Sequence, residues 1–241
     1  TGSGSVPLSE GGWETVSTSD LAFEGYAAPR ALALEELEGI KNEFVEAAKR
    51  SVAAGFDLLE IHAAHGYLLH QFLSPLSNQR TDIYGGSLEN RARLLVEIVI
   101  SIRAAIGDDL PLAVRFSATD WIEGGWTEAD TALVAQWCID AGADLFDIST
   151  AGLSTAQKIA VGPGFQVPFA EYVGEKVDAP VAAVGMITTG TQAEEILQKG
   201  IVDVVMIGRA ALGDPYWPIR AAKELGAEID YIPKRYKRAI F

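Results

Sequence analysis

The sequence predicts an α/β protein, a (β/α)8 TIM barrel of which five strands are apparent. From residue 35 onward, amphipathic helical stretches alternate with short apolar runs, as expected for parallel strands buried on both faces. Each apolar run ends in a polar residue or a glycine. A barrel builds its active site along this edge, whereas a doubly wound sheet uses one switch point. The spread of polar strand ends therefore favours the barrel.

The elements can be placed in chain order. The expected strands are residues 56–61, 112–116, 145–148, 181–184 and 202–207. The expected helices are roughly residues 35–54, 87–106, 127–141, 168–178, 190–199 and 214–225. Ser87 and Thr127 are credible helix N-caps, and Asp130 follows Thr127 at the spacing of a capping box. The glycines expected in the left-handed position after a helix are Gly55, Gly142 and Gly200.

Three regions follow from this pattern. Residues 1–34 are rich in Gly, Ser and Pro and show no periodicity, which predicts a loop or arm. Residues 35–225 form the partial barrel, and residues 226–241 form a C-terminal tail.

Composition excludes several classes of protein. The 241 residues include 19 Lys plus Arg and 33 Asp plus Glu, so the formal charge of −14 disfavours nucleic-acid binding. An anionic ligand must then be bound by a few placed cations and backbone N–H groups. Cys138 is the single cysteine and is expected to be a buried apolar residue, so no disulfide and no cysteine metal cluster is expected. No apolar run approaches the ~20 residues of a membrane span, and we expect a reducing cytoplasm.

The last two strand ends predict a phosphate site. Gly185 and Met186 follow one strand, and Gly208 and Arg209 follow the next. Barrels frequently bind phosphate in the loops after their last two strands, where glycine lets backbone N–H groups approach the anion. The alternative is that both glycines only permit tight turns.

Two other strand ends carry reactive side chains. Arg115 lies at the end of an apolar strand and needs a partner, either a carboxylate or an electron-rich ligand such as a flavin. His62, His65 and Tyr67 follow another strand. A metal site formed with His70 is disfavoured, because a third ligand is usually a carboxylate. Two main interpretations remain. The histidines are structural, or they form a substrate site in which imidazole N–H groups polarise an oxygen and the phenol gives a proton.

The segment from His62 to Arg91 closely resembles the signature segment of the Old Yellow Enzyme family of FMN-dependent ene reductases. The resemblance continues to Pro218 and covers nearly everything from Trp13 onward. The histidine at position 65, together with the short C-terminus, resembles the thermophilic-like bacterial subgroup of this family. Further matching runs are Val114-Arg115-Phe116-Ser117-Ala118, Gly162-Pro163-Gly164-Phe165-Gln166-Val167-Pro168, Ala183-Val184-Gly185-Met186-Ile187-Thr188, Ile207-Gly208-Arg209 and Pro215-Tyr216-Trp217-Pro218.

The resemblance implies a reaction and its residues. Hydride passes from NADPH or NADH to FMN and then to an activated alkene, such as an enone, enal or nitroalkene, and no metal takes part. His62 and His65 hold the activating oxygen of the substrate, and Tyr67 gives the proton. Arg238 of the tail reaches a neighbouring subunit's substrate site. The residues implied to bind FMN are Arg115, Gly185, Met186, Gly208 and Arg209.

The sequence departs from the family in one respect. The five apparent strands correspond to strands 4 to 8 of the family barrel, and strands 1 to 3 are not seen. Open sheet edges leave backbone groups unpaired, so we expect a complementing N-terminal fragment, with or without a homo-oligomer. The alternative is a truncated or non-catalytic fragment that does not turn over alone. Another FMN barrel with a different substrate is disfavoured by the segment from His62 to Arg91.

Overall fold

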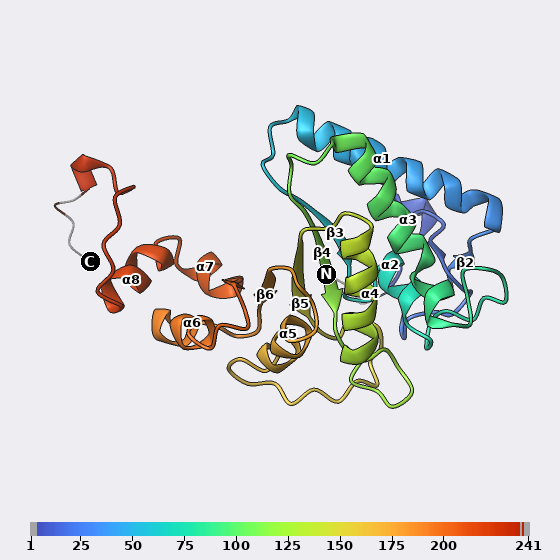
Figure 1. The fold of residues 1–241 in the computed structure, drawn as a ribbon. Helices are drawn as coiled ribbons and strands as arrows, with labels where there is room; N and C mark the ends of the chain where they lie inside the picture. The colour runs from blue at the N-terminus through green and yellow to red at the C-terminus, as the bar shows by residue number, and fades with distance from the viewer. Residues whose placement is uncertain (1–3, 237, 239–241) are drawn as a thin grey trace.

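The protein is described here from a computed structural model that places residues 4–236 and residue 238 (Figure 1). Five strands form one sheet: β3 (Leu59–Ala63), β4 (Leu112–Ser117), β5 (Leu145–Ser149), β6 (Val181–Ala183) and β7 (Val204–Val205). Helix α1 (Leu37–Ala53) precedes β3, and helices α7 (Arg209–Gly213) and α8 (Trp217–Glu224) follow β7. Between successive strands lie α2 (Leu68–Leu73) and α3 (Leu88–Ile106), then α4 (Glu128–Asp140), α5 (Val167–Gly174) and α6 (Gly190–Leu197). A 3-10 turn, η3 (Lys234–Tyr236), lies in the tail.

The strands lie in the sheet in their chain order, β3-β4-β5-β6-β7, and each is parallel to its neighbours. Parallel strands in chain order with helical connections are the pattern of part of a (β/α)8 barrel, so the predicted fold class is confirmed. β3 and β7 have one neighbour each. Within the described residues, both edges of the sheet are therefore open.

The two faces of the sheet differ. One face packs against helices in a single apolar core, and burial of each large side chain there contributes about 1.5–3 kcal/mol. The strand residues fully buried in this core include Val114, Phe116, Phe146 and Ile148. On the opposite face, the strand register aligns His62 with Arg115 and Arg115 with Asp147. Side chains alternate along a strand, so these three polar residues form a row across β3, β4 and β5.

Local signals place several element ends as predicted. The Ser87 hydroxyl accepts from the N–H of Asn90, and Thr127 and Asp130 form a capping box. Both predicted N-caps are confirmed. Positive φ angles confirm the glycines after the helices, with φ of 86° at Gly55, 102° at Gly142 and 70° at Gly200.

Other boundaries were wrong. The strand expected at residues 56–61 begins at Leu59, because Phe56 and Leu58 are exposed rather than buried in the sheet. The strand expected at 202–207 is reduced to β7, whose open edge provides no second partner. The helix expected from residue 214 begins at Trp217, since Asp214 is extended before Pro215. Helices α2 and α7 were missed because they are too short to show a helical period.

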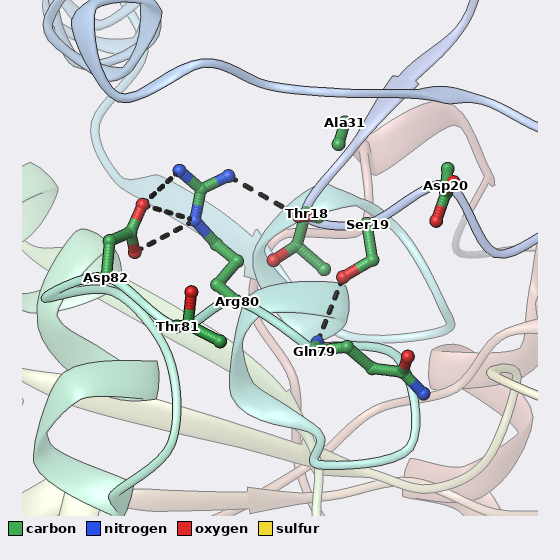
Figure 2. Close-up of a pocket in the computed structure, with 8 residues that line it drawn as sticks. All are labelled: Thr18, Ser19, Asp20, Ala31, Gln79, Arg80, Thr81 and Asp82. Carbon is green, nitrogen blue, oxygen red and sulfur yellow. Dashed lines mark hydrogen bonds and ion pairs between the residues drawn. The ribbon is translucent and has the colours of Figure 1, made fainter.

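The N-terminal arm is not wholly irregular. It contains the 3-10 turns η1 (Leu8–Glu10) and η2 (Leu34–Glu36) and a parallel pair of two-residue strands, β1 (Val16–Ser17) and β2 (Arg30–Ala31). Arg80 fixes the arm by donating to the carbonyl of Leu32 at 2.6 Å and pairing with Asp82 at 2.5 Å. This contact region lines a cavity of about 420 Å³. Figure 2 shows the eight lining residues, and none of the predicted site residues is among them.

No helix in the described part of the chain is long and apolar enough to cross a membrane. Cys138 is buried and unpaired, as expected, and burial raises the pKa of its thiol. The cytoplasmic location expected from the single cysteine stays a prediction.

Candidate active site at the carboxyl ends of the strands

Two imidazoles and a phenol converge after β3. The ring centroids of His62 and His65 are 5.1 Å apart, and those of His62 and Tyr67 are 5.3 Å apart. His62 lies on β3, His65 in the following loop, and Tyr67 immediately before α2. His65 has a φ of 56°, an uncommon angle for a residue with a side chain. The Tyr67 ring is exposed, and its hydroxyl forms no hydrogen bond within the described residues.

Ser149 contacts one ring nitrogen of His65. His65 Nε2 lies 2.8 Å from Ser149 Oγ, and the Ser149 hydroxyl lies 3.2 Å from Gln166 Oε1 as a donor. Thr150 also donates to Gln166 Oε1, at 2.7 Å. Ser149 Oγ can accept from His65 Nε2 or donate to it, so the contact orients the ring and is compatible with both neutral tautomers.

Both site histidines are held in the neutral form. Burial, followed by the charge of Arg115, lowers the pKa of His65 from 6.5 to about 4. The pKa of His62 is lowered by the same two causes in the same order. At neutral pH each ring therefore offers one N–H donor and no charge. This arrangement suits the polarisation of a neutral carbonyl or nitro oxygen.

Arg115 has a carboxylate partner. Its Nε lies 3.0 Å from Oδ2 of Asp147, and the exposed fractions of the two side chains are 28% and 0%. Burial raises the pKa of Asp147, and Arg115 opposes this rise. Glu60 lies nearby on β3, and its pKa is raised by burial and by Asp147. The carboxylate alternative from the sequence is thus confirmed, and the outer part of the guanidinium remains available to a ligand.

The ends of β6 and β7 present free backbone donors. The N–H groups of Gly185, Met186, Gly208 and Arg209 form no hydrogen bond within residues 4–236. Gly185 has a φ of 134° and Met186 a φ of 52°, so the chain turns sharply after β6. The Arg209 side chain is exposed and has no ionic partner in this part of the structure. Free amides beside a cation are the chemistry of an anion site.

The comparison with known sequences decides the family. The sequence profile of the NADH:flavin oxidoreductase / NADH oxidase family matches residues 13–228. The chain belongs to this family. An NADPH dehydrogenase of Bacillus subtilis (strain 168) is 49% identical to this chain, and the match covers 91% of this chain and 64% of the relative. An NADH:flavin oxidoreductase of Gibberella zeae is 47% identical over 91% of the chain and 57% of its own length. The chain thus spans 57–64% of these relatives.

Two solved structures are similar to this chain. The Old Yellow Enzyme homologue of Zymomonas mobilis superposes with a TM-score of 0.74 at 26% identity, covering 91% of this chain and 64% of its own. A 2-naphthoyl-CoA reductase superposes with a TM-score of 0.81 at 33% identity, covering 89% of this chain and 33% of its own. The resemblance to Old Yellow Enzyme is confirmed. At the level of the family, the expected cofactors FMN and NAD(P)H are confirmed as well.

The described residues of this family member fit FMN. A half-buried arginine faces away from the apolar core, and four free N–H groups with an exposed arginine lie at neighbouring strand ends. A Cβ at Gly208 would meet no protein atom within 4 Å, so protein packing does not explain this glycine. Gly185 is different, because a Cβ there would lie 3.1 Å from Gln166 and the φ angle is 134°. Close packing and the sharp turn therefore both favour glycine at position 185.

Arg238 is not brought to the site. Among the described residues, no hydrogen bond or ion pair joins Arg238 to His62, His65 or Tyr67. The segment after α8 lies beyond that helix in Figure 1, away from β3 and β4. Within a single chain, Arg238 therefore does not complete the substrate site.

Sequence reasoning missed Asp147 and identified Ser149 only as a polar strand end. Asp147 pairs with Arg115, and Ser149 contacts His65. Both alternate with core residues along β5, and a period of two was the signal available in Leu145–Ser149. The run of residues 145–148 was taken as almost wholly apolar, so Asp147 was overlooked. Within the described residues, no three side chains of His, Cys, Asp or Glu are grouped so that they could hold a metal ion.

Proposed function

We propose that this chain provides the FMN-binding and substrate-binding part of an NAD(P)H-dependent ene reductase. Its substrates are activated alkenes, namely enones, enals and nitroalkenes. The observation that carries the proposal is the convergence of His62, His65 and Tyr67 at a strand end in register with Arg115. Neutral imidazole donors suit a neutral electron-withdrawing oxygen, and a free phenol suits proton donation.

Each of these residues has one task. When bound, FMN supplies the transfer of a hydride from NAD(P)H to the β-carbon of the alkene. N–H groups of His62 and of His65, whose ring is oriented by its contact with Ser149, donate to the substrate oxygen and withdraw electron density from the alkene. The Tyr67 hydroxyl gives its proton to the α-carbon and regains one from water. The saturated product then has one hydride and one proton added across the former double bond.

FMN binding is assigned to the strand ends that follow β3 in the sheet, from β4 to β7. Arg115 is placed beside the flavin ring, where a cation stabilises the negative charge of the reduced form. The N–H groups of Gly185, Met186 and Gly208 and the side chain of Arg209 bind the phosphate. Free donors and an unpaired cation support this assignment.

The open sheet must be closed for a working site. The free edge of β3 borders an apolar groove that includes Phe44, Phe56 and Leu58, and Phe56 is 63% exposed. An open parallel edge beside exposed aromatic surface is costly in water. We infer that three further parallel strands, from a continuous or a separate segment, close the sheet between β3 and β7. A homo-oligomer in which Arg238 reaches a neighbouring site remains part of the same proposal.

The rival function is a fragment that binds FMN phosphate but does not turn over. The test compares this chain alone with the chain coexpressed with the part of the Bacillus subtilis relative outside the match. Anaerobic consumption of NADPH should equal formation of saturated ketone from 2-cyclohexenone. Tyr67→Phe should slow product formation, whereas Tyr231→Phe, a control of similar exposure, should not. NADPH consumption without saturated ketone in either sample would contradict the proposed substrate class.

A further inference from the structure

His70 and Asp120 form a buried pair behind the predicted site. His70 Nε2 lies 3.0 Å from Asp120 Oδ1, and both side chains are 0% exposed. Neither atom has another partner within the described residues. The other carboxylate oxygen, Oδ2, accepts from Ser74 Oγ at 2.6 Å and from the N–H of Trp126 at 2.8 Å. Burial opposes ionisation of Asp120, but the hydrogen bonds from His70, Ser74 and Trp126 bring its pKa below the usual value.

The second nitrogen of His70 is also occupied. Its Nδ1 accepts the backbone N–H of Gly66 at 2.9 Å, so Nδ1 carries no proton. The proton of neutral His70 is therefore on Nε2, where it faces the carboxylate of Asp120. One imidazole thus joins the β4–α4 loop, which holds Asp120, to the β3–α2 loop, which holds Gly66.

Gly66 lies in the chain between His65 and Tyr67, two residues of the predicted site. His65 has a φ of 56° and Gly66 a φ of 77°, so two successive residues occupy the left-handed region. Such a conformation costs roughly 1–3 kcal/mol for a residue with a side chain and persists when surrounding contacts hold it. A Cβ at Gly66 would lie 2.3 Å from the carbonyl oxygen of Gly152, so the loop is also closely packed there.

We propose that His70, oriented by Asp120, is a positioning residue that fixes the backbone between His65 and Tyr67. Through the N–H of Gly66 it sets where the His65 imidazole and the Tyr67 phenol point. His70 itself does not contact the substrate. The inference rests on the proposed function for its effect on turnover, but the geometry of the loop can be tested without turnover.

The first test reads the tautomers directly. The chain has three histidines, so ¹⁵N spectra of the imidazole rings at neutral pH contain three spin systems. His70 should show a protonated Nε2 and an unprotonated Nδ1. A His70 ring protonated on Nδ1 would overturn the proposal, since that nitrogen could not then accept from Gly66.

Two substitutions separate the two contacts of His70. His70→Asn keeps an acceptor near the Nδ1 position and loses the contact with Asp120. His70→Gln keeps a donor near the Nε2 position and loses the acceptor for Gly66. Loss of one hydrogen bond corresponds to about tenfold faster amide exchange, so Gly66 should exchange about tenfold faster in His70→Gln than in His70→Asn. The Phe146 amide, bonded to the carbonyl of Pro180, is the control for global opening.

The effect on the site is then measured in the flavin-loaded protein with its sheet closed. His70→Gln should weaken binding of 2-cyclohexenone about tenfold and leave FMN affinity unchanged. Equal Gly66 exchange in both variants, with Phe146 protected, would overturn the positioning role whether or not the protein reduces alkenes. Loss of Gly66 protection without any change in enone affinity would also overturn it. If the wild-type protein reduces no alkene, the proposed function fails, while the tautomer and exchange results still decide the local geometry.

Discussion

The pair formed by Arg115 and Asp147 predicts an asymmetry between two substitutions. Asp147 is 0% exposed, whereas Arg115 is 28% exposed and also interacts with Glu60. Removing the arginine in Arg115→Met leaves a buried carboxylate without its cation, at a cost of about 3–5 kcal/mol. Removing the carboxylate charge in Asp147→Asn leaves a partly hydrated arginine with Glu60 still near, at a cost of about 1–3 kcal/mol. We expect Arg115→Met to be the more destabilising by roughly 2 kcal/mol.

The pH dependence gives an independent check on this pair. Burial already raises the pKa of Asp147, and loss of Arg115 should raise it further. The native state then binds a proton more readily than the unfolded state. The stability of Arg115→Met should therefore rise relative to wild type as the pH falls from 7 to 5. Asp147→Asn cannot show this relief, because its side chain does not ionise.

The assay is urea unfolding of the flavin-free protein, followed by tryptophan fluorescence at pH 7 and pH 5. The double substitution should cost less than the sum of the two single ones, because the contact can be lost only once. The reasoning is refuted if Asp147→Asn destabilises as much as Arg115→Met at pH 7, or if the two costs are additive.

Three further outcomes are expected. Arg209→Ala should weaken FMN binding about tenfold or more in fluorescence titrations, since a charge-assisted hydrogen bond is worth about 1.5–3 kcal/mol, and the exposed Arg50→Ala serves as control. Ser149→Ala should weaken enone binding several-fold, about 1 kcal/mol, by removing the hydrogen bond that orients the His65 ring; unchanged binding counts against that role. The pKa of His65 is lowered from 6.5 to about 4, so the unfolded state takes up its proton first and stability should fall as pH drops through this window. In His65→Gln that fall should be smaller.

The sequence predicted those parts of the fold that depend on local chemistry. The caps at Ser87 and Thr127 and the glycines after helices act within a few residues, so their signals are complete in the sequence. Alternation of helices and apolar runs was sufficient for the parallel order of the strands. The ends of β3 and β7 were less well predicted, because the length of an edge strand depends on a neighbour that the local sequence does not describe.

The site was predicted by residue type but not by partnership. His62, His65 and Tyr67 are close in the sequence, so their convergence followed from the end of one strand. Asp147 meets Arg115 through the register of β4 and β5, which a single sequence does not provide. His70 was considered only as a third metal ligand, and its pairing with Asp120 across 50 residues of chain depends on how two loops pack.

The most direct test of the account is a titration of the purified chain with FMN, followed by flavin absorbance and fluorescence, with and without the complementing segment of a relative. The account predicts tight, stoichiometric binding when the sheet is closed, and weaker binding to the Arg209→Ala variant under the same conditions. Absence of FMN binding with the sheet closed, or equal affinity in wild type and Arg209→Ala, would contradict it.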